Sequence, residues 1–155
     1  MFKKTITYTD FDDNERTESY YFHMNKAEAY DWLLGLPADT RAKMQATVDK
    51  QNASLSEADV LAMMHYIRDL ILASVGEKSE DGRRFIKTDD YRKEFSQTEA
   101  FAQIYSELME NSDEATAFIN GVMPKDLVEA AEKANKNVTA LPKPKMAKGP
   151  ALTAK

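Results

Sequence analysis

The chain has 155 residues, of which 43% are hydrophobic and 30% are charged, and it contains no cysteine. A chain of this length and composition suits one soluble domain with a single core. The lack of cysteine excludes a disulfide framework and a thiolate site. No apolar run approaches the ~20 residues that span a bilayer, and the N-terminus lacks a signal-peptide pattern, so we expect a cytoplasmic protein.

The net charge of −5 is unevenly distributed along the chain. From Lys133 to the end there are six lysines and no acidic residue, which leaves 15 basic and 26 acidic residues before it, a net charge of −11. Because phosphate contacts supply most non-specific affinity for nucleic acid, this acidic body argues against a duplex-binding domain. The lysine-rich end has few large apolar side chains to offset the entropy of ordering, so we predict a disordered basic tail over residues 136–155.

The N-terminal segment, residues 1–24, carries the period-two pattern of half-buried strands. Ile6 and Tyr8 alternate with threonines, and Tyr20 and Phe22 belong to a second alternating run. An Asp-Asp-Asn sequence between the two runs is typical of a turn. We therefore predict a small β-hairpin that packs on the helical body, because a two-stranded ribbon alone is marginally stable.

Helical spacing of apolar residues predicts a mainly α fold, with a helical domain over residues 25–135. The strongest helix is opened by a capping pair, Ser56 and Asp59, and should lie at the centre of the core. Its apolar stripe consists of Val60, Met63, Met64, Ile67, Leu70, Ile71 and Val75. The other helices are predicted from Asn25 to Gly35, from Ala38 to Asn52, from about Gln97 to Met109, from Ser112 to Val122, and from Pro124 onward.

Two more capping pairs predict helix starts. Asn25 with Glu28 should open the first helix. Ser96 with Glu99 should open another helix near Gln97, since the hydroxyl can accept from the amide of Glu99 while that carboxylate reaches back to the amide of Ser96.

The segment from Gly76 to Lys87 separates the central helix from the helix that follows it. Gly76 comes directly after the apolar stripe, so we predict that it closes the helix in a left-handed conformation and that the chain turns there. Asp81 and Gly82 form a tight-turn pair. Residues 83–87 are short and partly apolar, which predicts a brief extended stretch.

Several of these sequences also match a known family. They are GEKSEDGRRFIK at 76–87, FSQTEAF at 95–101, KKTITYTDF at 3–11 and RTE at 16–18. With them the chain resembles, over roughly residues 1–130, the tail assembly chaperones of long, non-contractile-tailed bacteriophages of Gram-positive hosts. The resemblance implies a non-enzymatic protein that binds the aggregation-prone tape measure protein and helps the tail tube protein assemble around it. It also implies a place in the cytoplasm of the bacterial host and absence from the mature virion.

The residues that carry the resemblance are scaffold residues, not active-site residues. They are Gly76, Glu77, Lys78, Asp81, Gly82, Arg83, Arg84, Phe85, Phe95, Ser96 and Glu99. The family resemblance also implies a possible frameshift-extended form of the chain, for which the lysine-rich end would suit a linker.

Apolar helix faces are the predicted site of client binding. Eight methionines occur in the chain, and methionine is flexible enough to fit varied apolar partners, although for any single methionine a place in the core is the favoured interpretation. A groove that accepts an amphipathic helix would be a natural mode of capture. We place the contact on the C-terminal helices, at Phe101, Tyr105, Leu108, Met109, Phe118 and Ile119.

The residue pattern favours neither catalysis nor metal binding. His23 and His65 lack the spacing of a metal site. Asp12 and Asp13 lack the spaced ligands of a calcium loop. There is no nucleophile elbow and no glycine-rich phosphate loop, so we expect no enzyme activity, no metal and no cofactor.

Arg83, Arg84 and Lys87 leave two alternatives open. They could grip a phosphate, or they could form a local ion-pair cluster with nearby carboxylates, and the ion-pair cluster is favoured. The carboxylates are those of Glu77, Glu80, Asp81 and Asp89.

Two other functions remain as alternatives. A structural tail-completion or connector protein would form a ring of fixed stoichiometry and would stay in purified virions. A nucleic-acid-binding regulator would use the basic tail together with Arg83 and Arg84, and its affinity would fall steeply with salt. The acidic body makes the regulator the least favoured of the three functions.

Overall fold

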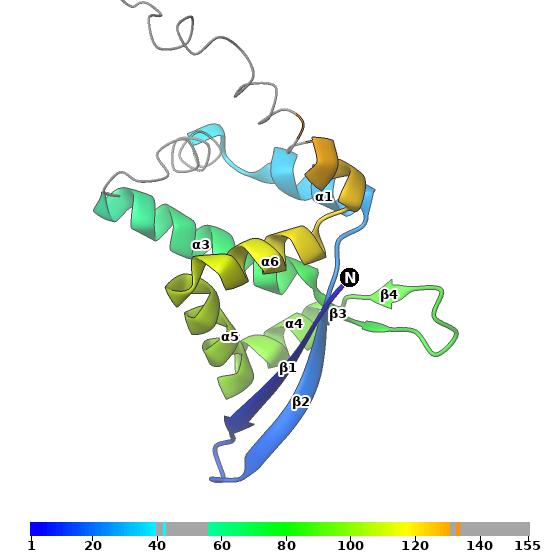
Figure 1. Cartoon of the computed structure of the whole chain (residues 1–155). Helices are drawn as coiled ribbons and strands as arrows, with labels where there is room; N and C mark the ends of the chain where they lie inside the picture. Colours follow the sequence, from blue (N-terminus) through cyan, green and yellow to red (C-terminus); the bar gives the residue numbers. More distant parts are fainter. Residues whose placement is uncertain (40–41, 43–55, 131–132, 134–155) are drawn as a thin grey trace, which may run out of the picture. The chain divides into compact units, whose positions relative to one another are not determined.

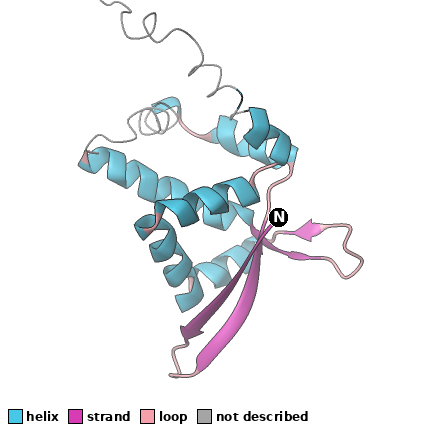
Figure 2. Ribbon diagram, in the orientation of Figure 1, coloured by secondary structure: helices cyan, strands magenta, loops and turns pink. Residues whose placement is uncertain are grey.

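The computed structural model describes residues 1–39, 42, 56–130 and 133. The chain divides into two units, Met1–Met123 and Pro124–Lys155, and all packing below concerns the first unit. The predicted class, mainly helical with a small N-terminal hairpin, is confirmed (Figures 1 and 2). The predicted disordered tail and its boundary after residue 135 lie outside the described residues, as does most of the predicted helix at 38–52.

The N-terminal hairpin forms as predicted. Strand β1 (Phe2–Thr9) pairs antiparallel with β2 (Glu15–Phe22) over their whole lengths. In the turn, a carboxylate oxygen of Asp10 accepts the backbone N–H groups of Asp12 and Asn14, each at 2.9 Å. The turn sequence therefore fixes the register of the two strands.

Two short strands extend the sheet in the order β1-β2-β3-β4. Strand β3 (Val75–Lys78) pairs antiparallel with the end of β2, and β4 (Phe85–Ile86) pairs antiparallel with β3. We call β3, β4 and the turn between them the arm, residues 75–86. Figure 1 shows the arm projecting away from the helices that pack on the N-terminal hairpin.

Local capping explains where the two N-terminal helices begin. The helices span Lys26–Gly35 (α1), Glu57–Ser74 (α3), Asp89–Ser96 (α4), Glu99–Glu110 (α5) and Ser112–Val122 (α6). Asn25 with Glu28 and Ser56 with Asp59 form capping boxes, which confirms both predicted starts. Helix α6 begins at Ser112 as predicted, although Asn111 is the residue that caps it.

The capping pair predicted at Ser96 and Glu99 is wrong. Ser96 is the last residue of α4, a helix that the sequence patterns missed, and its hydroxyl donates to the carbonyl of Lys93 at 2.7 Å. Thr98 caps α5 instead, by accepting the N–H of Phe101 at 3.1 Å. Because α4 runs through Ser96, the start of the next helix moves two residues further along the chain.

The turn predicted at Gly76 is also wrong. Helix α3 ends at Ser74 and the chain continues directly into β3, where Gly76 pairs with Tyr21. A Cβ atom at position 76 would lie 2.5 Å from the carbonyl oxygen of Ile86 and 2.8 Å from the ring of Phe85. Close approach of β4, rather than a left-handed backbone, requires glycine here. The predicted tight turn at Gly82 is confirmed, with φ at 71°.

An aromatic cluster joins the hairpin to the helices. Phe118 of α6 lies edge-on to Phe2 and to Phe22, with ring centroids 5.2 Å apart in each pair. Phe95 of α4 contacts Phe22 and Tyr20 at centroid distances of 6.0 and 4.8 Å. Full burial of one such side chain contributes roughly 1.5–3 kcal/mol, so these contacts are the main link between the sheet and the helices.

The second unit begins with a short helix. Residues 125–130 are helical, and the carbonyl of Pro124 accepts the N–H groups of Leu127 and Val128, each at 3.1 Å. Pro124 therefore precedes the first helical residue by one position.

Candidate partner-binding site

Half of the residues predicted to bind a partner are in the core. Phe101, Leu108 and Phe118 are buried. The ring of Phe101 packs on Phe95, and the guanidinium of Arg68 covers it at 5.3 Å from the ring centroid. These three side chains are not accessible to a partner in this conformation.

The other three predicted residues are half-buried on the same helices. They are Tyr105, Met109 and Ile119. Tyr105 stacks on Phe101 with ring centroids 6.0 Å apart, and its hydroxyl donates to the carbonyl of Met64 at 3.5 Å. A role of this face in client binding stays a prediction.

Exposed apolar side chains occur instead on α1 and at the start of α3. Tyr30 and Leu34 on α1 and Val60 and Leu61 on α3 are exposed, Leu34 to 69%. Helix α1 contacts α3 through Trp32, whose ring lies 5.0 Å from that of Tyr66. We call the four exposed side chains the α1/α3 apolar surface. Large apolar side chains left in water on these two helices are candidates for contact with a partner protein.

The base of the arm is tied to the start of α1. The Nζ atom of Lys87 lies 2.9 Å from the carboxylate of Glu28, and the Lys87 side chain is only 5% exposed. The second oxygen of Glu28 accepts the N–H of Asn25 at 2.8 Å. Burial lowers the pKa of Lys87 against the effect of Glu28. Burial would raise the pKa of Glu28, but the bonds from Asn25 and Lys87 lower it.

Hydrogen bonds hold the tip of the arm. The hydroxyl of Ser79 donates to Asp81 at 2.6 Å, and the same carboxylate oxygen accepts the N–H of Arg83 at 3.1 Å. The Ser79 hydroxyl also accepts the N–H of Arg84 at 3.0 Å. The hydrogen bond from Ser79 lowers the pKa of Asp81, as does the N–H of Arg83. The backbone that carries the two arginines is therefore ordered by its own side chains.

The predicted ion-pair cluster at the arm is largely wrong. Within the described residues, Arg83 lies 3.8 Å from Asp81, but the Arg83 side chain is 84% exposed. Lys87 pairs with Glu28, and Asp89 pairs with Arg92 at 3.0 Å. A pair as exposed and as long as that of Arg83 contributes under ~1 kcal/mol. The tip of the arm thus presents cations that are weakly neutralised.

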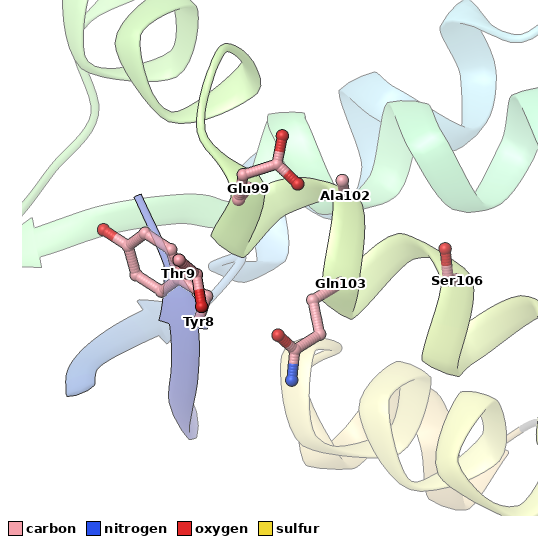
Figure 3. A pocket seen from close by; sticks show the side chains of 6 residues that line it. All are labelled: Tyr8, Thr9, Glu99, Ala102, Gln103 and Ser106. Carbon is pink, nitrogen blue, oxygen red and sulfur yellow. The ribbon is translucent and has the colours of Figure 1, made fainter. Parts of the chain in front are cut away.

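An open pocket lies between the end of β1 and the outer side of α5 (Figure 3). Its volume is about 320 Å³ and its lining residues are Tyr8, Thr9, Glu99, Ala102, Gln103 and Ser106. The Tyr8 hydroxyl donates to Glu18, which raises the pKa of Tyr8. Among the described residues, the lining offers hydroxyls, one amide and one carboxylate.

The histidines do not form a metal site in the part of the chain that the structure describes, where no group of three His, Asp or Glu side chains could hold an ion. His23 packs edge-on against Phe85 at a centroid distance of 5.7 Å, and burial lowers its pKa. Over the same residues, the structure contains no helix with the length and apolar character needed to cross a membrane.

A sequence model of the family described as phage tail assembly chaperone matches residues 1–153. The chain belongs to this family. Neither the comparison with curated proteins nor the comparison with solved structures finds a match.

The structure shows where the residues that carry the family resemblance lie. Most of them form the arm: Gly76, Glu77, Lys78, Asp81, Gly82, Arg83, Arg84 and Phe85. Phe95 joins the aromatic cluster, whereas Ser96 ends α4 and Glu99 begins α5. The connection from α3 to α4 is therefore a β-hairpin, and it contains most of the residues that carry the resemblance.

The sequence analysis did not select the α1/α3 apolar surface, although the sequence contains a signal for it. Trp32, Leu33 and Leu34 are consecutive, as are Val60 and Leu61. Consecutive apolar residues on a helix point in different directions, so one helix face cannot bury all of them.

Proposed function

We propose that this chaperone binds the tape measure protein of its phage and assists assembly of the tail tube around that client, without catalysing a reaction. Membership of the tail assembly chaperone family is the observation that carries the proposal. The α1/α3 apolar surface supports it, because a client with exposed apolar stripes needs an apolar surface to bind.

We further propose that the client contacts the α1/α3 apolar surface before it contacts α5 and α6. Tyr30, Leu34 and Leu61 are exposed, whereas Phe101 and Phe118 are buried among other aromatic rings. An amphipathic helix that lays its apolar face on this surface would remove both apolar areas from water.

Binding in this mechanism is reversible. The chaperone would cover apolar stripes of the client in the host cytoplasm until tail tube protein replaces it, so it would be absent from the mature virion. Many weak contacts along a long client would give high avidity while each contact could still be exchanged. A frameshift-extended form of the chain would be a second partner in this process.

Co-expression with the tape measure protein of the same genome tests the proposal. We expect the chaperone to raise the soluble fraction of that client and to co-purify with it. A virion protein would instead remain in purified particles, where mass spectrometry would detect it. An insoluble client with no recoverable complex, even with the extended form added, would contradict the proposal.

Matched variants test the surface. The triple substitution Tyr30→Gln, Leu34→Gln and Leu61→Gln removes exposed apolar area and keeps good helix-forming residues at two leucine positions. We expect it to lower the recovered client several-fold. Phe11→Gln is the control, because Phe11 is 78% exposed but lies in the β1–β2 turn. Equal loss with both variants would show that the surface is not specific.

A further inference from the structure

The arm borders a second pocket, of about 370 Å³, whose charged lining is mainly basic. Lys78, Arg83 and Arg84 line it from the arm, and Glu28 lines it from α1. Glu28 is already paired with the buried ammonium of Lys87. Three positive charges from the arm therefore line the pocket, and the one carboxylate in its lining is already paired.

The cations of this arm pocket have weak partners or none among the described residues. Arg84 makes no side-chain hydrogen bond or ion pair there, and the Arg83 pair with Asp81 is long and exposed. The ammonium of Lys78 lies 5.0 Å from the ring centroid of Tyr21, a contact that leaves its charge available to an anion. A charged surface of this kind can still gain ion pairs when a partner binds.

The tip is also ordered before any partner binds. The backbone N–H groups of Arg83 and Arg84 donate to the Asp81 carboxylate and to the Ser79 hydroxyl oxygen, respectively. At the base, Gly76 packs against β4 and Lys87 is anchored to Glu28. Because the backbone is already in place, binding costs mainly the side-chain entropy of the cations.

We propose that the arm pocket is a docking site for an acidic segment of a partner protein. The planar guanidinium groups of Arg83 and Arg84 match carboxylates with two parallel hydrogen bonds, and Lys78 adds a third positive charge. This site lies on the arm, uses charge instead of apolar area, and does not depend on the proposed client or on its surface.

The surroundings favour an acidic protein segment over nucleic acid. Glu77, Glu80 and Asp81 line a neighbouring pocket on the arm, and Lys78 and Arg84 line both pockets. A polymer with a negative charge at every unit would meet these carboxylates, and the body as a whole is acidic. A protein segment can place its few carboxylates only where the cations lie.

Binding of a fluorescein-labelled ten-residue peptide, with three glutamates among glycines and serines, to the full chain tests the site. Anisotropy titrations at low salt should show binding that weakens as salt is added. The double variant Arg83→Ala and Arg84→Ala should bind about tenfold more weakly. The matched control, Lys93→Ala with Lys125→Ala, removes two exposed positive charges elsewhere and should change affinity by less than about twofold.

Three results would overturn the proposal. The first is a lack of glutamate-peptide binding by the unaltered chain, and the second is an equal loss in the two double variants. The third is tighter binding of a ten-nucleotide oligo-dT than of the peptide through the same arginines, which would assign the pocket to nucleic acid. Circular dichroism melts show whether each variant is folded. If the double alanine variant is not folded, Arg83→Lys with Arg84→Lys replaces it; this variant keeps the charges but loses the paired guanidinium hydrogen bonds, so it should bind a few-fold more weakly than the unaltered chain.

Discussion

The two hairpins of the sheet are ordered by different forces. The β1–β2 hairpin is held by side chains, since Phe22 and Phe118 pack together with Phe2 in the core. The arm is held at its tip by hydrogen bonds of Ser79 and Asp81, which are exposed to water. Apolar burial of a large side chain contributes more than a surface hydrogen bond, typically about 1 kcal/mol. Most of the stability of the sheet therefore comes from the N-terminal hairpin.

The N-terminal hairpin therefore contributes stability, whereas the arm holds charged side chains in water. The outer face of the N-terminal hairpin consists largely of hydroxyl pairs, such as Thr5 with Ser19 at 2.8 Å and Thr7 with Thr17 at 2.9 Å. Each hydroxyl in these pairs has its hydrogen-bond partner in the other. The arm instead holds Arg83 and Arg84 in water on an ordered backbone. The charges at the exposed tip of the arm can change without endangering the fold, which suits a recognition site.

The largest expected effect comes from breaking the packing of the N-terminal hairpin. Phe118→Ala should lower the free energy of unfolding by about 3–5 kcal/mol, because it leaves a cavity between α6 and both strands. Urea denaturation measures this loss. If the alanine variant does not fold, Phe118→Leu replaces it and should show a smaller loss. Phe11→Ala, at an exposed position, should cost under ~0.5 kcal/mol. A loss under ~1 kcal/mol for Phe118→Ala would mean that the hairpin is not anchored there.

Sequence patterns correctly predicted the elements that depend on residues close together in the chain. The hairpin, the Asn25 cap and the Ser56 cap depend on residues within a few positions of one another, and all three are confirmed. Ser96 with Glu99 has the same local pattern, but α4 already includes Ser96. A capping pattern is therefore decisive only where no preceding helix competes for the capping residue.

Sequence patterns could not predict what depends on distant contacts. Gly76 is needed because β4 passes close to it, and β4 comes ten residues later in the chain. Likewise, periodicity placed Phe101 and Tyr105 on one face of α5, but only packing against α4 decides that Phe101 is buried. Consecutive apolar residues on α1 and α3 indicate that some of them stay uncovered, but only the assembled fold decides which ones are exposed.

An intermediate effect is expected at the base of the arm. Glu28→Gln keeps the capping box of α1 but leaves the buried ammonium of Lys87 without its carboxylate. We expect Glu28→Gln to lower the free energy of unfolding by about 1–3 kcal/mol, which is more than Lys87→Met should lower it. An unpaired buried charge costs more than an unpaired half-exposed carboxylate. Urea denaturation at pH 7 should show this order, and the reverse order would mean that the ammonium is hydrated.

The pH dependence of the same pair gives a second test. The pKa of Glu28 is lower in the folded state than its ordinary value of 4.5, so its contribution is present above that value and is lost as pH falls through the folded-state pKa. The Lys87 pKa is also lowered, from 10.5, so stability should rise slightly as pH approaches 10.5 from below. Glu28→Gln should therefore have a flatter stability curve below pH 4.5 than the unaltered chain.

The smallest effect on folding, and the sharpest test of the comparison, is expected at the tip of the arm. Asp81→Ala removes the acceptor of the Ser79 hydroxyl and of the Arg83 N–H, which should loosen the tip but lower the free energy of unfolding by under ~1 kcal/mol. Amide hydrogen exchange should become several-fold faster at Arg83 and Arg84. Glu80→Ala, at the neighbouring exposed position, should leave both amides unchanged. If Asp81→Ala instead destabilised the whole domain as strongly as Phe118→Ala, the arm would be part of the folding core, and its separation from the N-terminal hairpin would not hold.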